Sequence, residues 1–307
     1  MNHSTLEIFI QVAETQSVTQ AAKRLGRAQS NITTRIQQLE EELAVELFVR
    51  GNKKMVLSPA GVQFLSYARR ILSLAEEAKQ ALHPTTPGGS LRLGAMEATA
   101  ASRLPPLLTR FQQQCPQVDI TLITQPTRQL TEGVLTAALD AALVCLPPGA
   151  DGQPACPDEL AFTPVFYETL MLVRPQTPGP LRFAAFASGC SYRALGERWL
   201  AEQQAAVEVH EVNSYHSMLA CVASGRYACL LPQSVLSLMT LPENCLSEPL
   251  CEATTQLIWR SGLSAPALSE WRKAAAKRGD WLSLAFGKDQ PCGNQQRQRR
   301  GIERRVK

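Results

Sequence analysis

The sequence predicts a protein of the α/β class with an all-α part at its N-terminus. Apolar residues recur at helical spacing through most of residues 1–82. Residues 91–231 instead alternate short apolar runs with helical segments, which is the pattern of βαβ units and a parallel sheet. Residues 83–90, rich in Pro and Gly, are typical of an exposed linker between the two parts. The length of 307 residues agrees with one to three globular domains.

The basic charge of the chain is concentrated at its C-terminus. The whole chain carries 31 Lys and Arg against 27 Asp and Glu, a net charge of +4. Residues 288–307 hold 7 basic and 2 acidic residues, a net +5, so the rest of the chain stands at −1. The overall charge is therefore poor evidence for nucleic-acid binding. We predict a disordered tail, with weak contact to phosphates as the alternative.

The sequence predicts a cytoplasmic protein with reduced thiols. No apolar run approaches the roughly 20 residues that cross a bilayer, and the first residues lack the pattern of an export signal. The nine cysteines are irregularly spaced, without a CxxC pair. Cys221 and Cys229 fall at apolar positions, so we favour packing over a disulfide for this pair.

Three helices are predicted before residue 44. The first carries an apolar stripe from Leu6 to Ala13. The second has Ser17 as its N-cap and ends at Gly26, and the third begins at Gln29. The exposed side of the third helix carries amides, hydroxyls and one guanidinium. Such a pair of short helices fits a helix-turn-helix that reads base edges in a major groove, and a small helical bundle with a solvated face is the alternative.

Residues 48–57 favour the helix-turn-helix. Two short apolar runs flank a Gly-Asn turn, which predicts a β-hairpin wing. Arg50, Lys53 and Lys54 at its tip are expected to contact phosphates. Ser58 and Pro59 then predict the start of a helix that runs to about residue 82.

Apolar residues along this long helix recur at alternating steps of three and four. They predict a seam for a second copy of the chain, made of Phe64, Ala68, Ile71, Ala75, Ala78 and Leu82. Packing of the helix on its own domain is the alternative. We prefer the dimer because the linker at 83–90 separates the helix from the α/β part of the chain.

Five segments of this N-terminal part carry a family resemblance: SVTQAAKRL at 17–25, QSNIT at 29–33, IQQLE at 36–40, LFVR at 47–50 and LSPAG at 57–61. Together they closely resemble the LysR-type transcriptional regulators, and the resemblance extends to about residue 287. It implies a winged helix-turn-helix, a long dimerising linker helix and a two-lobed effector-binding domain like a periplasmic binding protein. Ser30 stands where a Pro is common in the family, and Ala44 where a Gly is usual.

The resemblance implies a division of the chain and a set of contacts. The division is a DNA-binding domain at 1–58, a linker helix at 59–82, a hinge at 83–90, an effector-binding domain at 91–287 (lobe I at 91–163 and 265–287, lobe II at 164–264) and the tail. The residues expected to contact bases are Gln29, Ser30, Asn31, Thr33, Thr34, Arg35 and Gln38. Expected partners are promoter DNA on the nucleoid, other copies of the chain in a dimer or tetramer, a small-molecule effector and RNA polymerase. No cofactor and no metal ion are expected.

The α/β part is predicted in detail. Strands are expected at 91–95, 118–124, 140–145, 182–186, 207–212 and 228–231, and helices at 103–114, 128–138, 192–202, 214–224 and 266–278. Residues 165–173 should cross into the second lobe, and helix 266–278 should return to the first. Ligands of such open sheets bind at the carboxyl ends of the strands, in the cleft between the lobes.

Effector contacts are predicted on both sides of this cleft, at Glu97, Ala98, Thr99, Cys190, Ser191, Tyr192 and Arg193. Helix N-termini near Thr99 and Ser191 favour a carboxylate, which Arg193 would reinforce. Glu97 instead suits a cationic amine, so an amine, an amino acid and a carboxylate all stay open. Residues 189–193 weakly resemble regulators of putrescine use within the family. The alternative is a solvated Glu97 and an Arg193 paired with Glu197.

An enzyme and a redox sensor are the competing functional classes. The chain lacks phosphate-binding, dinucleotide-binding, metalloprotease and nucleophile-elbow motifs. His210 and His216 have no partners at metal-ligand spacing, so we predict no enzymatic activity. Cys190 lies at a predicted helix N-terminus, which lowers a thiol pKa, and is the alternative site for thiol-based sensing.

Overall fold

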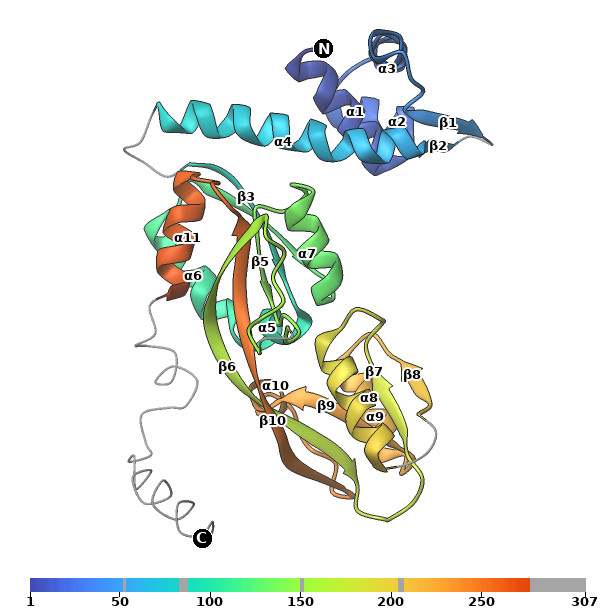
Figure 1. The fold of residues 1–307 in the computed structure, drawn as a ribbon, viewed down its shortest axis with the longest axis vertical. Coiled ribbons are helices and arrows are strands. Elements are labelled where there is room, and N and C mark those ends of the chain that lie inside the picture. The colour runs from blue at the N-terminus through green and yellow to red at the C-terminus, as the bar shows by residue number, and fades with distance from the viewer. Residues whose placement is uncertain (52–53, 83–87, 150–151, 204–206, 277–307) are drawn as a thin grey trace.

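The computed structural model describes residues 1–51, 54–82, 88–149, 152–203 and 207–276. A small N-terminal domain, a long helix and an α/β domain follow one another along the chain (Figure 1). The predictions for Lys53 and for residues 288–307 lie outside the described residues. Within the described part, no helix is long and apolar enough to cross a membrane.

The N-terminal domain contains the predicted three helices and hairpin. They are α1 (His3–Thr15), α2 (Val18–Leu25), α3 (Gln29–Leu43), β1 (Phe48–Gly51) and β2 (Lys54–Leu57). Ser17 caps α2 by accepting the backbone N–H of Gln20 at 3.3 Å, and Gly26 ends the helix in the left-handed region at φ +62°. The prediction of a helix-turn-helix with these two caps is confirmed.

A buried contact joins α3 to the hairpin. The Glu40 carboxylate accepts the backbone N–H groups of Leu47 at 2.7 Å and of Phe48 at 3.0 Å. These two residues open the hairpin and are themselves fully buried. Because the bonds to Glu40 connect the last turns of α3 to the start of β1, the hairpin holds a defined position relative to that helix.

Part of the predicted dimer seam on the long helix α4 (Pro59–Ala81) faces the N-terminal domain instead of a second copy. The Phe64 ring lies 5.1 Å from that of Phe9, and Ala68 is fully buried in the N-terminal core. Arg69 pairs with Glu14 on α1 at 3.1 Å. In its first half the helix therefore packs on its own domain, the alternative considered from the sequence. A heptad stripe has the same spacing whether it faces its own core or a partner.

The second half of α4 keeps the exposed apolar face that the seam requires. Ile71 is 41%, Leu74 65% and Leu82 78% exposed in the single chain. Ala78 is also exposed, and Ala75 is half-buried. In the single chain, the predicted seam is therefore exposed for a second copy only from residue 71 onwards.

The α/β domain is built on one sheet in the strand order β4-β3-β5-β10-β6-β9-β7-β8. Lobe I contributes β3 (Gly89–Ala95), α5 (Glu97–Ser102), α6 (Leu104–Gln114), β4 (Val118–Thr124), α7 (Thr127–Leu135), β5 (Ala141–Val144) and α11 (Pro266–Ala276). Lobe II contributes β7 (Arg182–Ala185), α8 (Ser191–Gln203), β8 (Val209–Glu211), α9 (Tyr215–Ala223), β9 (Tyr227–Pro232) and α10 (Gln233–Leu236). β3, β4 and β5 run parallel, as do β7, β8 and β9.

Two long antiparallel strands connect the lobes (Figure 1). They are β6 (Leu160–Pro175) and β10 (Cys245–Arg260). β6 pairs with β9 in lobe II, and β10 pairs with β5 in lobe I, where Trp259 lies opposite Ala141. The chain thus crosses back to lobe I along β10, and helix 266–278, predicted to return to lobe I, lies there as α11.

The sequence predicted neither the strand β10 nor α5 as a separate short helix. The first half of β10 is polar and mostly exposed, so its sequence has no continuous apolar run. The predicted helix 103–114 is preceded by a separate short helix, α5, that ends at Arg103. α11 packs against α6 in lobe I, with the Trp271 and Phe111 rings 5.2 Å apart.

Candidate functional site

The outer face of α3 carries every residue predicted to contact bases. Ile32, Ile36 and Leu39 point into the domain and are buried. The exposed side chains are those of Gln29, Ser30, Asn31, Thr33, Thr34, Arg35 and Gln38. This face has no acidic residue in its first turn and combines amide, hydroxyl and guanidinium groups, the donors and acceptors that base edges require.

The hairpin supplies one described cation near its tip. Lys54 is exposed at the start of β2. Arg50 lies opposite Met55 in the β1–β2 register. Gln16, at the C-cap of α1, accepts the backbone N–H of Met55 at 3.0 Å and so ties the hairpin to the helices.

A cavity of about 240 Å³ lies between the two lobes of the α/β domain. Lobe I lines it with the segments that follow β3 and β4, and lobe II with the segments that follow β7 and β8. The lining residues are Met96, Glu97, Ala98, Thr124, Gln125, Pro126, Thr127, Phe186, Ala187, Cys190, Tyr192, Asn213 and Tyr215. The cavity therefore occupies the carboxyl ends of the parallel strands, where the topology predicts a ligand.

Four of the seven predicted effector residues line this cavity: Glu97, Ala98, Cys190 and Tyr192. The other three, Thr99, Ser191 and Arg193, are not among the lining residues. Thr99 is 3% exposed and lies outside the cavity wall. The Ser191 hydroxyl donates to the carbonyl of Cys145 at 2.5 Å, which joins the two lobes.

Arg193 is held in ion pairs away from the cavity. Its guanidinium contacts Glu197 at 2.7 Å and Glu211 at 2.6 Å, and it also donates to the carbonyl of Phe186. The pairing with Glu197, considered as the alternative from the sequence, is the arrangement in the structure. Arg193 is therefore engaged by lobe II itself rather than aimed at a ligand.

Several lining residues were not predicted from the sequence. Thr124 to Thr127 follow β4, Phe186 and Ala187 follow β7, and Asn213 and Tyr215 follow β8. The rule that ligands bind at the carboxyl ends of parallel strands would have indicated all of them. The residues predicted as effector contacts follow only the first strand of each lobe, β3 and β7.

Glu97 is the only acidic residue among the described residues that line the cavity. No hydrogen bond or ion pair connects Glu97 to the described part of the chain, and no Lys, Arg or His lines the cavity there. Burial raises the pKa values of Tyr192 and Tyr215 well above the usual 10, with neighbouring ionisable groups adding to the shift. Both phenols therefore stay neutral, and the described lining holds one carboxylate, that of Glu97, and no basic side chain.

A second carboxylate lies behind the cavity wall and is neutralised. Glu168 on β6 is buried and pairs with the guanidinium of Arg103 at 2.6 Å. Arg103 also lies over the ring of Phe166, 5.9 Å from its centroid. Unlike Glu97, this carboxylate has a complete partner within the protein, so it has no need of a ligand cation.

The surroundings of Cys190 disfavour its thiolate form. Burial raises the pKa of Cys190, and this outweighs the N–H groups of Arg193 and Tyr192, which lower it. The helix N-terminus thus lowers this pKa as expected, but the cost of an ionised sulfur away from water is larger and the net shift is upward. All eight cysteines in the described residues, Cys221 and Cys229 included, are free thiols.

Comparison with known families gives the same division of the chain. Residues 3–62 match the bacterial regulatory helix-turn-helix protein family of lysR type, and residues 84–280 match the LysR substrate binding domain. The chain belongs to the LysR family. It is a DNA-binding transcriptional regulator with an effector-binding domain, not an enzyme.

Relatives in Bacillus subtilis are similar over most of their length. The HTH-type transcriptional regulator YusT is 34% identical over 262 residues, which covers 84% of this chain and 88% of YusT. The HTH-type transcriptional regulator GltR is 34% identical over 247 residues, which covers 77% of this chain and 81% of GltR.

Solved LysR-family structures share the whole fold at lower identity. Full-length OxyR from Pseudomonas aeruginosa aligns with a TM-score of 0.69 and 19% identity, covering 95% of this chain and 99% of that one. Full-length CbnR in complex with its target DNA aligns with a TM-score of 0.60 and 21% identity, covering 90% and 99%. The N-terminal domain, long helix and two-lobed domain thus form a LysR-family architecture.

Proposed function

We propose that this LysR-family regulator reads promoter DNA with the outer face of α3, and that an amine-bearing metabolite in the interlobe cavity modulates that binding. The observation that carries the effector assignment is the unpaired Glu97 carboxylate in a cavity whose described lining holds no cation. The assignment of α3 rests on its exposed row of amide and hydroxyl side chains.

The DNA interface combines α3 with the wing. Gln29, Ser30, Asn31, Thr33, Thr34, Arg35 and Gln38 would contact base edges, and Arg50, Lys53 and Lys54 would contact phosphates. The bond from Glu40 to the start of the hairpin supports a fixed spacing between these two sets. CbnR, which shares this fold, has been solved with its target DNA.

A protonated amine would gain two kinds of contact in the cavity. Glu97 offers a charge-assisted hydrogen bond, and the rings of Phe186 and Tyr215, 4.9 Å apart, offer aromatic faces. Asn213 and Gln125 add side-chain carbonyls that accept hydrogen bonds. Amines with one or several ammonium groups, polyamines among them, satisfy this description.

A ligand with only carboxylates is less well supported. Arg193 is paired within lobe II, and the first N–H groups of α8 point at the sulfur of Cys190. An amino acid fits the proposal because its ammonium group would meet Glu97, whereas a dicarboxylate would place its charge near that of Glu97.

The proposed assembly is a dimer through the second half of α4, with a tetramer through the effector domains as the larger form. The exposed face of Ile71, Leu74, Ala78 and Leu82 supports this contact. The regulator would act on the nucleoid, where RNA polymerase is the proposed partner at the promoter.

A double variant tests the recognition helix. Gln29→Ala with Thr34→Ala should weaken binding to the protein's own promoter region in a gel shift by at least about 10-fold, since one good base contact is worth ~1–3 kcal/mol. Gln37→Ala, exposed on the same helix but outside the predicted set, is the matched control. Normal shifting by the double variant would show that another surface reads the DNA.

A thermal-shift screen tests the effector class. Amines such as 1,4-diaminobutane and amino acids should include a stabiliser, whereas succinate should not stabilise the protein. Glu97→Gln should weaken binding of that stabiliser by about 10- to 100-fold, the value of a hydrogen bond to a charged group. Glu132→Gln, an exposed carboxylate on α7 outside the cavity, should leave it unchanged. A carboxylate as the sole stabiliser would overturn the assignment.

A further inference from the structure

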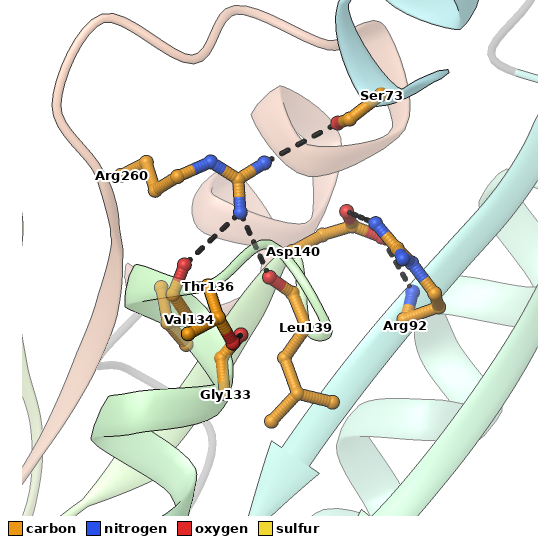
Figure 2. Close-up of polar contacts among 8 residues, drawn as sticks. All are labelled: Ser73, Arg92, Gly133, Val134, Thr136, Leu139, Asp140 and Arg260. Carbon is orange, nitrogen blue, oxygen red and sulfur yellow. Dashed lines mark hydrogen bonds and ion pairs between the residues drawn. The ribbon is translucent and has the colours of Figure 1, made fainter. Parts of the chain in front are cut away.

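One helix of lobe I reaches from the cavity to the linker helix. At its first end, Pro126 and Thr127 line the cavity. At its last turn, the carbonyl of Val134 contacts Arg260 (Figure 2). The nine residues of α7 span roughly 14 Å at 1.5 Å per residue. A displacement at the cavity therefore has a short, rigid route to the surface that faces α4.

Arg260 connects the far end of α7 to α4. One guanidinium nitrogen, Nη1, donates to the carbonyls of Val134 at 3.1 Å and Leu139 at 3.0 Å. The other, Nη2, donates to the hydroxyl of Ser73 on α4 at 3.3 Å (Figure 2). A cation is favoured at the carbonyls of a helix C-terminus. Because the guanidinium is planar, a shift of the α7 end changes the direction of the donor that reaches Ser73.

The turn after α7 is held firmly in lobe I. The Gly133 carbonyl accepts the backbone N–H of Leu139 at 2.9 Å. The next residue, Asp140, accepts from the guanidinium of Arg92 at 2.6 Å and from its backbone N–H at 2.8 Å (Figure 2). The two carbonyls that accept from Arg260 are therefore expected to move together with α7 and β3. The bond from Arg260 to Ser73 connects this unit to α4.

The cavity end of α7 is also bonded to lobe II. The backbone N–H of Arg128 donates to the carbonyl of Gly189, in the loop before α8, at 3.3 Å. Gly189 has a φ of +97°, and a Cβ there would lie 2.9 Å from the Gln129 side chain. Glycine therefore permits this close approach. Any change in the separation of the lobes acts directly on the first turn of α7.

A second element leads from the cavity to the same arginine. Tyr192 lines the cavity and lies close to Thr255 on β10. The next residue, Gln256, accepts the backbone N–H of Leu146 at 3.0 Å through its side-chain carbonyl. Arg260 is the last residue of this strand. Both α7 and β10 thus connect the cavity wall to Arg260.

We propose that α7 and Arg260 transmit the state of the interlobe cavity to the linker helix through Ser73. The inference rests on the proposed function in that the cavity is the effector site, but it does not depend on the effector being an amine. Arg260 is a positioning residue, because it contacts α7 and α4 and does not line the cavity. Since α4 packs on the DNA-binding domain through Phe64 and Ala68, a shift of α4 at Ser73 moves that domain relative to lobe I.

A cavity-filling variant tests this connection without an identified effector. Ala187→Trp places an indole in the cavity from an exposed position in lobe II and should push the lobes apart. Amide hydrogen exchange is measured on the full-length protein, in the segment of α4 around residue 73 and in the last turn of α7. We expect roughly fivefold faster exchange in both segments, as for the loss of one hydrogen bond.

Two further variants, each combined with Ala187→Trp, test the contact at α7 and the contact at α4 separately. In Ser73→Ala, exchange in α4 should already be faster and should not respond further to Ala187→Trp, while the α7 turn should still respond. In Arg260→Lys, the single ammonium group cannot serve all three acceptors, so the α4 response should be lost and the α7 turn should be loosened at the outset. Ser66→Ala is the control, because that hydroxyl donates to Gln63 within α4.

An α4 response to Ala187→Trp that is the same in all four backgrounds, including no response at all, would overturn the proposal. Failure of every amine to stabilise the protein would overturn the effector class and leave this result unaffected. The two hypotheses are therefore tested separately.

Discussion

One residue of α3's C-terminus, Ala44, replaces the glycine that is usual in the family, at a cost in folding stability. Ala44 ends α3 with φ +52°, a left-handed conformation that a Cβ makes unfavourable. Its backbone N–H still caps the helix by donating to the carbonyls of Glu40 and Glu41. The position where the family usually has Gly thus keeps the geometry of a glycine cap, with the strain of an alanine.

Ala44→Gly should stabilise the N-terminal domain by about 0.5–1 kcal/mol, because glycine adopts this conformation without strain. Urea unfolding followed by circular dichroism measures the change. Ala13→Gly, in the last turn of α1, should have the opposite sign and cost up to about 1 kcal/mol. Equal destabilisation by both substitutions would show that the left-handed cap carries no strain.

Buried thiols give the effector domain a pH dependence of known sign. Burial raises the pKa of Cys145 from 9.0 to about 12, with the neighbouring thiols Cys190 and Cys251 adding to the shift. The unfolded chain therefore releases this proton first, so the free energy of unfolding falls as pH rises from 9 towards 12. In Cys145→Ala this decline should be shallower, and below pH 9 the two curves should run parallel. Urea midpoints measured across this window check the prediction, and curves that stay parallel throughout would contradict it.

At the scale of an element, α4 has two roles along its length. Its first half completes the N-terminal core through Phe64, Ala68 and the Arg69–Glu14 pair. Its second half presents Ile71, Leu74 and Leu82 to the outside. Substitutions in the two halves should therefore have different consequences, although both fall on one heptad pattern.

Ile71→Glu should lower the oligomer mass in light scattering without loss of helical signal, because it places a carboxylate in the proposed seam. Phe64→Ala should instead destabilise the N-terminal domain by about 3 kcal/mol through the lost packing on Phe9, and leave the oligomer intact. An unchanged mass for Ile71→Glu would exclude this face as the dimer contact.

For the whole molecule, the residues expected to bind the promoter specifically lie far in the sequence from the tail that carries the net positive charge. Without residues 288–307 the net charge changes from +4 to −1, but the predicted base and phosphate contacts all lie in the first 54 residues. Removal of this tail should therefore leave promoter affinity intact and weaken binding to random DNA at low salt. Gel shifts on both DNAs at two salt concentrations measure this. A larger loss on the promoter than on random DNA would give the tail a specific role.

Features that depend on neighbouring residues could be predicted from the sequence. Ser17 and Gly26 bound α2, the Gly-Asn turn marks the wing, and the alternation after residue 91 indicates the parallel strands. The exposed face of α3 is set by the same helical period. Caps, turns and periodicity act within a few residues, so they can be interpreted without knowledge of the fold.

The partner of each ambiguous residue depends on contacts between segments that are distant in the sequence. Phe64 has the spacing of a dimer seam but faces Phe9, and Arg193 has the position of a ligand contact but pairs with Glu197 and Glu211. β10 is a strand because it pairs along its length with β6, and Arg260 reaches Ser73 across 187 positions of sequence. These contacts join segments far apart in the chain, and their free energy depends on burial and geometry that no local pattern encodes.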